Sequence, residues 1–260
     1  MEGRLMLTLK LEKGLNSCLY YQNPKMYKKI HIYLFIILFT MNCKKEKTFF
    51  DENGIEFIKF SKNNIFVSKY EISNQTFINF VNDGYKKNII TIDSLNRVLG
   101  SYDGDRYYNE GLKILYKINT ESDIQFEDSS FYCLNDRNLL PVRKISWFAS
   151  HLFCSYYEYR LPKENEWLNL SLESSYNDQL FENKVTEVNK IFDLTTDGIV
   201  NINSNVSEWI EPFFDNQWPY KQIRGVSYKN IFDPLNKKLG NYAPQLLEDV
   251  GFRPIIDIKK

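Results

Sequence analysis

The chain has 260 residues, of which 43% are hydrophobic and 16% aromatic, so it carries enough apolar surface to fold and a disordered chain is excluded. Its 33 basic residues are balanced by 33 acidic ones, and no basic patch points to a nucleic-acid partner. His151 is one of only 2 histidines, and the other lies in the N-terminal leader, so a multi-histidine zinc or iron site is excluded.

The N-terminal segment is predicted to direct export. Residues 26–42 combine Lys28 and Lys29 with an apolar run over residues 32–41, about half the ~20 residues that a transmembrane helix needs. This pattern is typical of a signal peptide. Residues 1–25 precede it without a clear period, and we interpret them as an extended leader or as the result of a misassigned start codon.

Cys43 follows the apolar run directly, as the lipidated cysteine of a bacterial lipoprotein does. It predicts a lipid anchor in the membrane and a location in the cell envelope, at the periplasmic or surface face of the outer membrane. Thr40 and Asn42 depart from the usual lipoprotein pattern, so secretion without an anchor stays the alternative. Residues 43–54 are predicted to be a polar tether, and residues 55–260 the folded domain.

Cleavage before Cys43 would make the mature protein mildly acidic. The leader removed carries six of the 33 basic and two of the 33 acidic residues, which leaves 27 against 31. An acidic protein of this kind has no electrostatic reason to bind nucleic acid.

The first helix is predicted after a group of short strands between residues 57 and 67. Ser73 is a suitable cap for it. Phe77, Phe80 and Val81 then follow at the i, i+3 and i+4 spacing that is typical of an amphipathic helix.

Residues 88–140 are predicted to be an insertion within one domain, because a separate core is not evident in them. Hydrophobic alternation over residues 124–126 and 131–133 predicts a hairpin inside this insertion.

A second helix is predicted to begin after Ser146, with Phe148, Leu152 and Phe153 on one apolar face. His151 lies off that face, which is typical of an exposed histidine without a special role.

A third helix is predicted to open at Pro162, in the first turn, where the missing N–H of proline costs nothing. The next residue, Lys163, has no hydrogen-bond acceptor in its side chain and cannot cap the helix.

Once the leader and Cys43 are set aside, the remaining cysteines are Cys133 and Cys154. Their spacing leaves both a disulfide and two buried free thiols open.

Six short motifs stand in one order along the chain, and together they resemble the formylglycine-generating enzyme family, also called sulfatase-modifying-factor-like. The resemblance covers roughly residues 55 to 256 and implies an α+β fold of the complex C-type-lectin-like kind, with short irregular sheets and two main helices. The motifs are EISNQ at residues 71–75, PVRKISW at 141–147, RLPKENEW at 160–167, SNVSEW at 204–209, RGVSY at 224–228 and GFR at 251–253.

The resemblance also implies a calcium site, since catalytic relatives hold this ion in the loop before the SEW sequence. The ligands would be the Asn201 side-chain amide, the Ser204 and Val206 carbonyls and the Glu208 carboxylate. Calcium prefers such a set of oxygen ligands. The alternative is that Asn201 and Glu208 hydrogen-bond the loop to itself.

The copper chemistry of the family is predicted to be absent. Catalytic relatives bind copper through two cysteines that closely follow the Arg-Gly motif, but no cysteine occurs after Cys154, and Asn230 stands where the first would be. Copper(I) needs soft thiolate ligands. We therefore expect no formylglycine-generating activity and no copper, zinc or iron cofactor.

The function predicted from these features is a lipid-anchored binding or scaffold module of the cell envelope. Phe213, Trp218 and Tyr220 form a candidate platform for a ligand, and the partner would be an envelope protein or a glycan. The alternative is an envelope enzyme of the same family with a different chemistry. An activity that depends on a thiol, or on a metal and is abolished by a chelator, would distinguish the enzyme from the binding module.

Overall fold

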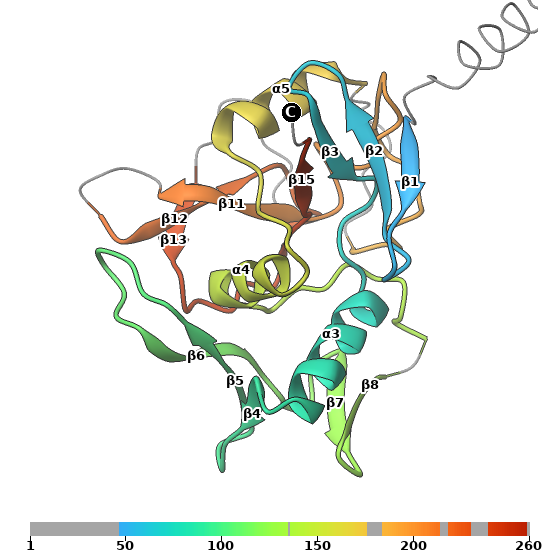
Figure 1. The fold of residues 1–260 in the computed structure, drawn as a ribbon. Coiled ribbons are helices and arrows are strands. Elements are labelled where there is room, and N and C mark those ends of the chain that lie inside the picture. The colour runs from blue at the N-terminus through green and yellow to red at the C-terminus, as the bar shows by residue number, and fades with distance from the viewer. Residues whose placement is uncertain (1–46, 135, 176–183, 214–217, 230–238, 259–260) are drawn as a thin grey trace, which may run out of the picture. The chain divides into compact units, whose positions relative to one another are not determined.

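Three helices and several small sheets make up the part of the chain that the computed structural model describes (Figure 1). The described residues are 47–134, 136–175, 184–213, 218–229 and 239–258. The predicted signal peptide, Cys43 and Asn230 lie outside them. The helices are α3 (Asn74–Lys86), α4 (Trp147–Tyr156) and α5 (Glu164–Glu173).

The first sheet joins the beginning of the described chain to its end. It has the order β1-β2-β3-β15, and each pair of neighbours is antiparallel. Its strands are β1 (Thr48–Phe50), β2 (Glu56–Phe60), β3 (Ile65–Ser68) and β15 (Ile255–Asp257). The segment just after the GFR motif is thereby fixed beside β3.

The predicted start of the folded domain at residue 55 is too late, because strand β1 already belongs to the sheet. The ring centroid of Phe49 lies 4.9 Å from that of Phe66 and 5.5 Å from that of Phe57. These aromatic contacts explain why the fold begins several residues before Ile55.

The second sheet carries three of the six motifs. Its order is β13-β12-β11-β14, with β14 parallel to β11 and the other neighbours antiparallel. Its strands are β11 (Ser207–Phe213), β12 (Tyr220–Arg224), β13 (Leu239–Tyr242) and β14 (Val250–Gly251).

The predicted insertion forms a sheet and a hairpin within the same compact unit, which begins at Lys47. The sheet has the order β4-β5-β6. The hairpin is confirmed, with Phe126 paired to Phe131 in register. The strands are β4 (Ile90–Ile92), β5 (Arg97–Tyr102), β6 (Gly111–Lys117), β7 (Ile124–Glu127) and β8 (Ser130–Cys133). Two further short strands, β9 (Ser174–Ser175) and β10 (Leu194–Thr195), pair with each other.

The first two helix caps are confirmed. The Ser73 hydroxyl accepts a hydrogen bond from the backbone N–H of Thr76 at 3.2 Å, and the Ser146 hydroxyl accepts one from that of Ala149 at 3.2 Å. Each cap satisfies one of the N–H groups that a helix start leaves open.

The start of α5 differs from the prediction. Pro162 lies before the helix instead of in its first turn, because Lys163 has the extended backbone of a cap residue. Lys163 offers no acceptor, but its own N–H donates to the Glu166 carboxylate at 2.8 Å. Half of a capping box therefore remains.

Aromatic side chains dominate the interior between α3, α4 and the sheets. Phe153 of α4 contacts Phe77 and Phe80 of α3 and Phe252 of the GFR motif, with ring centroids 5.2–6.3 Å apart. Cys154 is buried among these groups, and both it and Cys133 are free thiols, so the disulfide alternative is wrong.

None of the helices in the described ranges is long and apolar enough to cross a membrane.

Candidate functional site

The loop predicted to bind calcium lies beside a buried guanidinium group. Arg253 and Glu208 both have fully buried side chains, and Arg253 Nε donates to Glu208 Oε1 at 2.6 Å. The other two nitrogens of Arg253 donate to four backbone carbonyls at 2.9–3.4 Å, which belong to Ser68, Lys69, Val200 and Asn201. All five N–H groups of the guanidinium therefore have acceptors.

Glu208 is held on its other side as well. Its Oε2 accepts a hydrogen bond from the indole N–H of Trp167 at 3.1 Å. Burial raises the pKa of this carboxyl group, and the Arg253 charge acts against that rise. Because a charge buried without a partner is strongly unfavourable, the Glu208 carboxylate and the Arg253 cation depend on each other.

The Asn201 side chain is also engaged within the fold. Its amide oxygen accepts from the N–H of Phe192 at 3.0 Å, and its amide nitrogen donates to the carbonyl of Lys190 at 2.8 Å. Asn201 and Asn205 adopt left-handed backbone conformations, with φ of 56° and 63°, which asparagine tolerates better than most residues.

Ser204 and Val206 lie in the same buried loop, and Asp193 organises it. The Ser204 hydroxyl donates to the Asp193 carboxylate, which also accepts from the N–H groups of Ile202 and Asn203. The sequence analysis did not identify Asp193, since it lies outside the family motifs.

These contacts do not fit a calcium ion. The only carboxylate of the predicted ligand set is neutralised by Arg253, and the Asn201 oxygen already accepts a backbone N–H. No group of three or more His, Cys, Asp or Glu side chains within the described ranges could hold a metal ion. The donor set instead fits the alternative in which the loop is bonded to itself.

We therefore expect that calcium up to millimolar concentration leaves the melting temperature unchanged. An ion that bound only the folded protein would raise it by mass action. Differential scanning calorimetry with calcium and with a chelator is the measurement. A rise in melting temperature that Glu208→Gln abolishes would reinstate the calcium site.

Glu71, of the first motif, is a buried carboxyl group that the sequence analysis missed as a site residue. Its side chain is 2% exposed, and its Oε1 accepts from the Asn205 amide at 3.1 Å. Oε2 has no hydrogen-bond partner among the described residues. Burial raises the pKa of Glu71 to about 8, although the nearby Arg253 charge acts in the opposite direction.

The RGVSY segment forms a network of hydrogen bonds with residues distant in the sequence. Ser227 Oγ donates to Asp249 Oδ2 at 2.5 Å. Arg143 lies over the Tyr228 ring, donates to its hydroxyl at 3.2 Å and donates to Asp123 at 3.0 Å. The hydrogen bonds therefore fix the side-chain positions of Ser227 and Tyr228.

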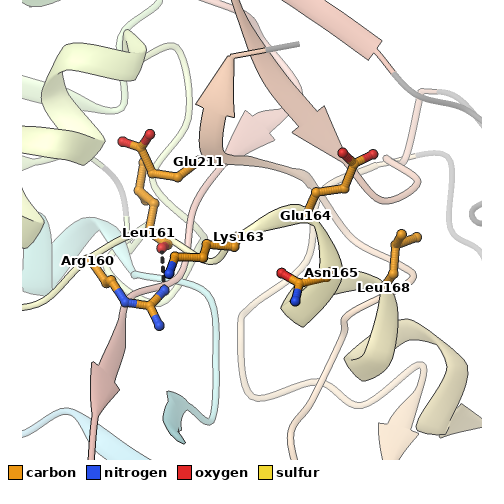
Figure 2. Close-up of a pocket in the computed structure, with 7 residues that line it drawn as sticks. All are labelled: Arg160, Leu161, Lys163, Glu164, Asn165, Leu168 and Glu211. Atoms are coloured by element: carbon orange, nitrogen blue, oxygen red, sulfur yellow. Dashed lines mark hydrogen bonds between the residues drawn. The ribbon is translucent and has the colours of Figure 1, made fainter. Parts of the chain in front are cut away.

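A hollow of about 690 Å³ opens beside the start of α5 (Figure 2). It is lined by Arg160, Leu161, Lys163, Glu164, Asn165, Leu168 and Glu211. Arg160 is fixed by hydrogen bonds to Glu166 and Asp257 at 2.6–2.8 Å. Arg160 of the RLP motif thus links α5 to β15.

The acidic groups of this hollow also have partners. Glu164 pairs with Arg224, and Glu211 lies 3.6 Å from His151 Nδ1. His151 is only partly exposed, because its ring stacks on Trp147 with centroids 4.7 Å apart. Both of these carboxylates therefore lie close to a basic side chain.

The predicted aromatic platform is found in part. Trp218 is 53% exposed, and its ring stacks against Tyr220. Tyr242, which the sequence analysis missed, contacts Tyr220 from the neighbouring strand. Phe213 belongs to β11, but its side chain lies outside the described part of the structure. Trp209 is fully buried and belongs to the core.

Comparisons with known proteins agree with the motifs. The family model of the sulfatase-modifying factor enzyme 1-like domain (FGE-sulfatase) matches residues 39–171. The solved structure of PvdO from Pseudomonas aeruginosa is 12% identical, covers 83% of this chain and 100% of its own, and has a TM-score of 0.52, which shows a shared fold.

Weaker similarities exist to two other solved structures. CarF is 14% identical with a TM-score of 0.48, covering 75% of this chain and 87% of its own. Treponema denticola variable protein 1 is 11% identical with a TM-score of 0.46, covering 82% of this chain and 99% of its own. No curated protein matches the sequence. Because the family model spans about half of the 260 residues and the six motifs stand in family order, the chain belongs to the sulfatase-modifying factor enzyme 1-like (FGE-sulfatase) family.

Proposed function

We propose that this protein is a lipid-anchored binding or scaffold module of the cell envelope, and that it does not perform the thiol chemistry of formylglycine-generating relatives. The observation that carries this proposal is the absence of any cysteine after Cys154. The position of the copper ligands, after the RGVSY segment, then offers no thiolate for copper(I).

The two cysteines of the domain do not replace the missing pair. Cys154 lies on the buried face of α4, and burial raises the pKa of its thiol well above the usual value. Burial also raises the pKa of Cys133, which lies at the end of β8. Both groups are therefore poor sources of the thiolate form at neutral pH.

The exposed aromatic residues support a binding role. Trp218 and Tyr242 present large rings to solvent, although three other tryptophans of the chain are buried. Tryptophan and tyrosine are enriched at sites of recognition because they combine a large contact area with a polar group.

The lipid anchor is tested by labelling cells with an alkyne fatty acid. We expect the full-length protein to carry the label and to fractionate with membranes, whereas Cys43→Ala loses both properties. Cys18→Ala is the matched control and keeps both. Label that persists in Cys43→Ala, or mature protein that still contains residues 26–42, would contradict the anchor.

A further inference from the structure

A second pocket, of about 230 Å³, lies between the first sheet and the start of α3. Its lining comes from β1, from the segments before β2 and after β3, from the first turn of α3, and from Leu139 and residues 188–189. We call it the Glu71 pocket, after the most buried carboxyl group in this lining. Pockets for larger ligands usually enclose about 300–1,000 Å³, so this one suits a small molecule or a single side chain.

The mouth of the Glu71 pocket is apolar. Phe50 of β1 and Leu139 both belong to the lining, and they are 69% and 44% exposed. Ile55, Ile72 and Val188 also line the pocket and are each at most 6% exposed. Exposed apolar side chains above apolar walls suit a ligand that has a hydrocarbon chain.

The carboxyl group of Glu71 gives the pocket a polar end. Glu71 is 2% exposed, its Oε1 accepts from the Asn205 amide, and its Oε2 has no hydrogen-bond partner among the described residues. Buried oxygens without a partner are rare and unfavourable. Glu56, the other carboxyl group of the lining, already pairs with Lys69 at 3.0 Å. Glu71 is therefore the acid of this pocket that can accept a further hydrogen bond.

The charge around Glu71 favours a cation as the ligand. Glu71 and Glu208 are both buried, and the charge of Arg253 acts on both of them. One guanidinium group neutralises only one of two carboxylates, so burial keeps a proton on Glu71 and raises its pKa to about 8. A positive charge on a ligand can take the place of that proton.

A single available oxygen suits an ammonium group better than a metal ion. Metal ions such as calcium need several oxygen ligands. No group of three or more acidic, histidine or cysteine side chains in the described ranges could supply them. An alkyl ammonium ion combines one compact charge with an apolar stem, as a lysine side chain does.

We propose that the Glu71 pocket binds the ammonium end of an alkyl amine, either a lysine side chain of an envelope partner or a small free amine. The ammonium group would donate to Glu71 Oε2, and its carbon chain would lie along Phe50 and Leu139. The proton of Glu71 passes to the solvent when the ion pair forms. This inference rests on the proposed binding role and gives it a class of ligand.

Isothermal titration calorimetry of the full-length protein tests the inference with two ligands, pentylamine and an acetylated peptide that contains one internal lysine. In buffers of different ionisation enthalpy at pH 7, we expect the release of about one proton per ligand, because Glu71 is mostly protonated at that pH. A peptide that binds more tightly than pentylamine identifies a protein partner as the source of the amine. Equal binding identifies a free amine.

The affinity should increase with pH. Only the ionised form of Glu71 pairs with the ammonium group, and its fraction falls about tenfold for each pH unit below the pKa of about 8. The alkyl amine keeps its charge in this range, since its pKa is about 10.4. We therefore expect an affinity that rises about tenfold per unit between about pH 5 and pH 7 and is constant above about pH 8.5.

Substitutions separate the two ends of the pocket. Glu71→Gln should weaken binding by at least about tenfold at pH 8 and abolish the proton release, because it removes the ion pair. Leu139→Arg should weaken binding by about threefold, since it places a like charge at the mouth. Leu95→Arg, at an exposed position outside the lining, is the matched control and should bind like the parent. A melting curve for each variant checks that it is folded.

Four results would contradict the inference. They are no binding of either ligand at millimolar concentration and pH 8, binding of pentanol as tight as that of pentylamine, an affinity that does not change with pH, and unchanged binding by Glu71→Gln. The proposed function is tested separately, because the labelling at Cys43 and the lack of turnover do not depend on this pocket.

Discussion

Arg253→Met is expected to lower the free energy of unfolding by about 3–5 kcal/mol, because it leaves the buried Glu208 carboxylate without a cation. The substitution also leaves four backbone carbonyls without their donors. These carbonyls come from the β3 end and from the loop before β11, so the guanidinium connects the two main sheets.

Urea denaturation measures this effect. Arg97→Met is the matched control, because Arg97 forms its ion pair with Asp93 at the surface, and such pairs contribute at most about 1 kcal/mol. The double variant Arg253→Met, Glu208→Gln should recover part of the loss, since it removes the uncompensated charge. An Arg253→Met variant as stable as Arg97→Met would contradict the account of this buried pair.

Glu71→Gln is expected to remove a large part of the pH dependence of stability between about pH 4.5 and pH 8. The pKa of Glu71 is raised in the folded protein from the ordinary 4.5 to about 8. The folded state therefore holds a proton that the unfolded state has lost within this window, and stability falls as the pH rises through it. Each pKa unit corresponds to about 1.4 kcal/mol, so the full shift amounts to roughly 5 kcal/mol.

The measurement is the difference in unfolding free energy between the parent and Glu71→Gln at several pH values. A glutamine at this position still accepts the hydrogen bond from Asn205, but it cannot ionise. We expect the variant to gain stability relative to the parent as the pH rises, with little further change above pH 8. The exposed Glu121→Gln serves as control. A difference that stays constant with pH would show that Glu71 is already ionised.

Local features were the part of the fold that the sequence predicted well. The caps at Ser73 and Ser146 depend on residues only three positions apart, and the hairpin at residues 124–133 depends on a short alternation. The class of fold was predicted in a different way, through the resemblance of the six motifs to a known family. Strand β1 was missed because its assignment depends on Phe49 packing against strands that follow it.

The candidate sites depend on contacts between distant residues, which explains why they were predicted incompletely. Glu208 and its cation Arg253 are 45 residues apart, and Glu71 and Asn205 are 134 apart. Calcium was a reasonable expectation from Asn201 and Glu208 alone, since the position of Arg253 is not visible from the loop. Tyr242 was missed because it joins Tyr220 only through the pairing of β12 and β13.

The central claim, that this family member binds instead of oxidising cysteine, is tested most directly by a turnover assay. The purified protein is incubated with copper, oxygen and a peptide that carries a sulfatase-type cysteine motif, and mass spectrometry then detects any aldehyde product. A catalytic relative in a parallel sample verifies the assay. Because no thiolate pair follows the RGVSY segment, we predict that the peptide remains unchanged. Aldehyde formation that depends on the protein and is lost in Asn230→Ala or Cys154→Ser would contradict the claim and establish an enzyme.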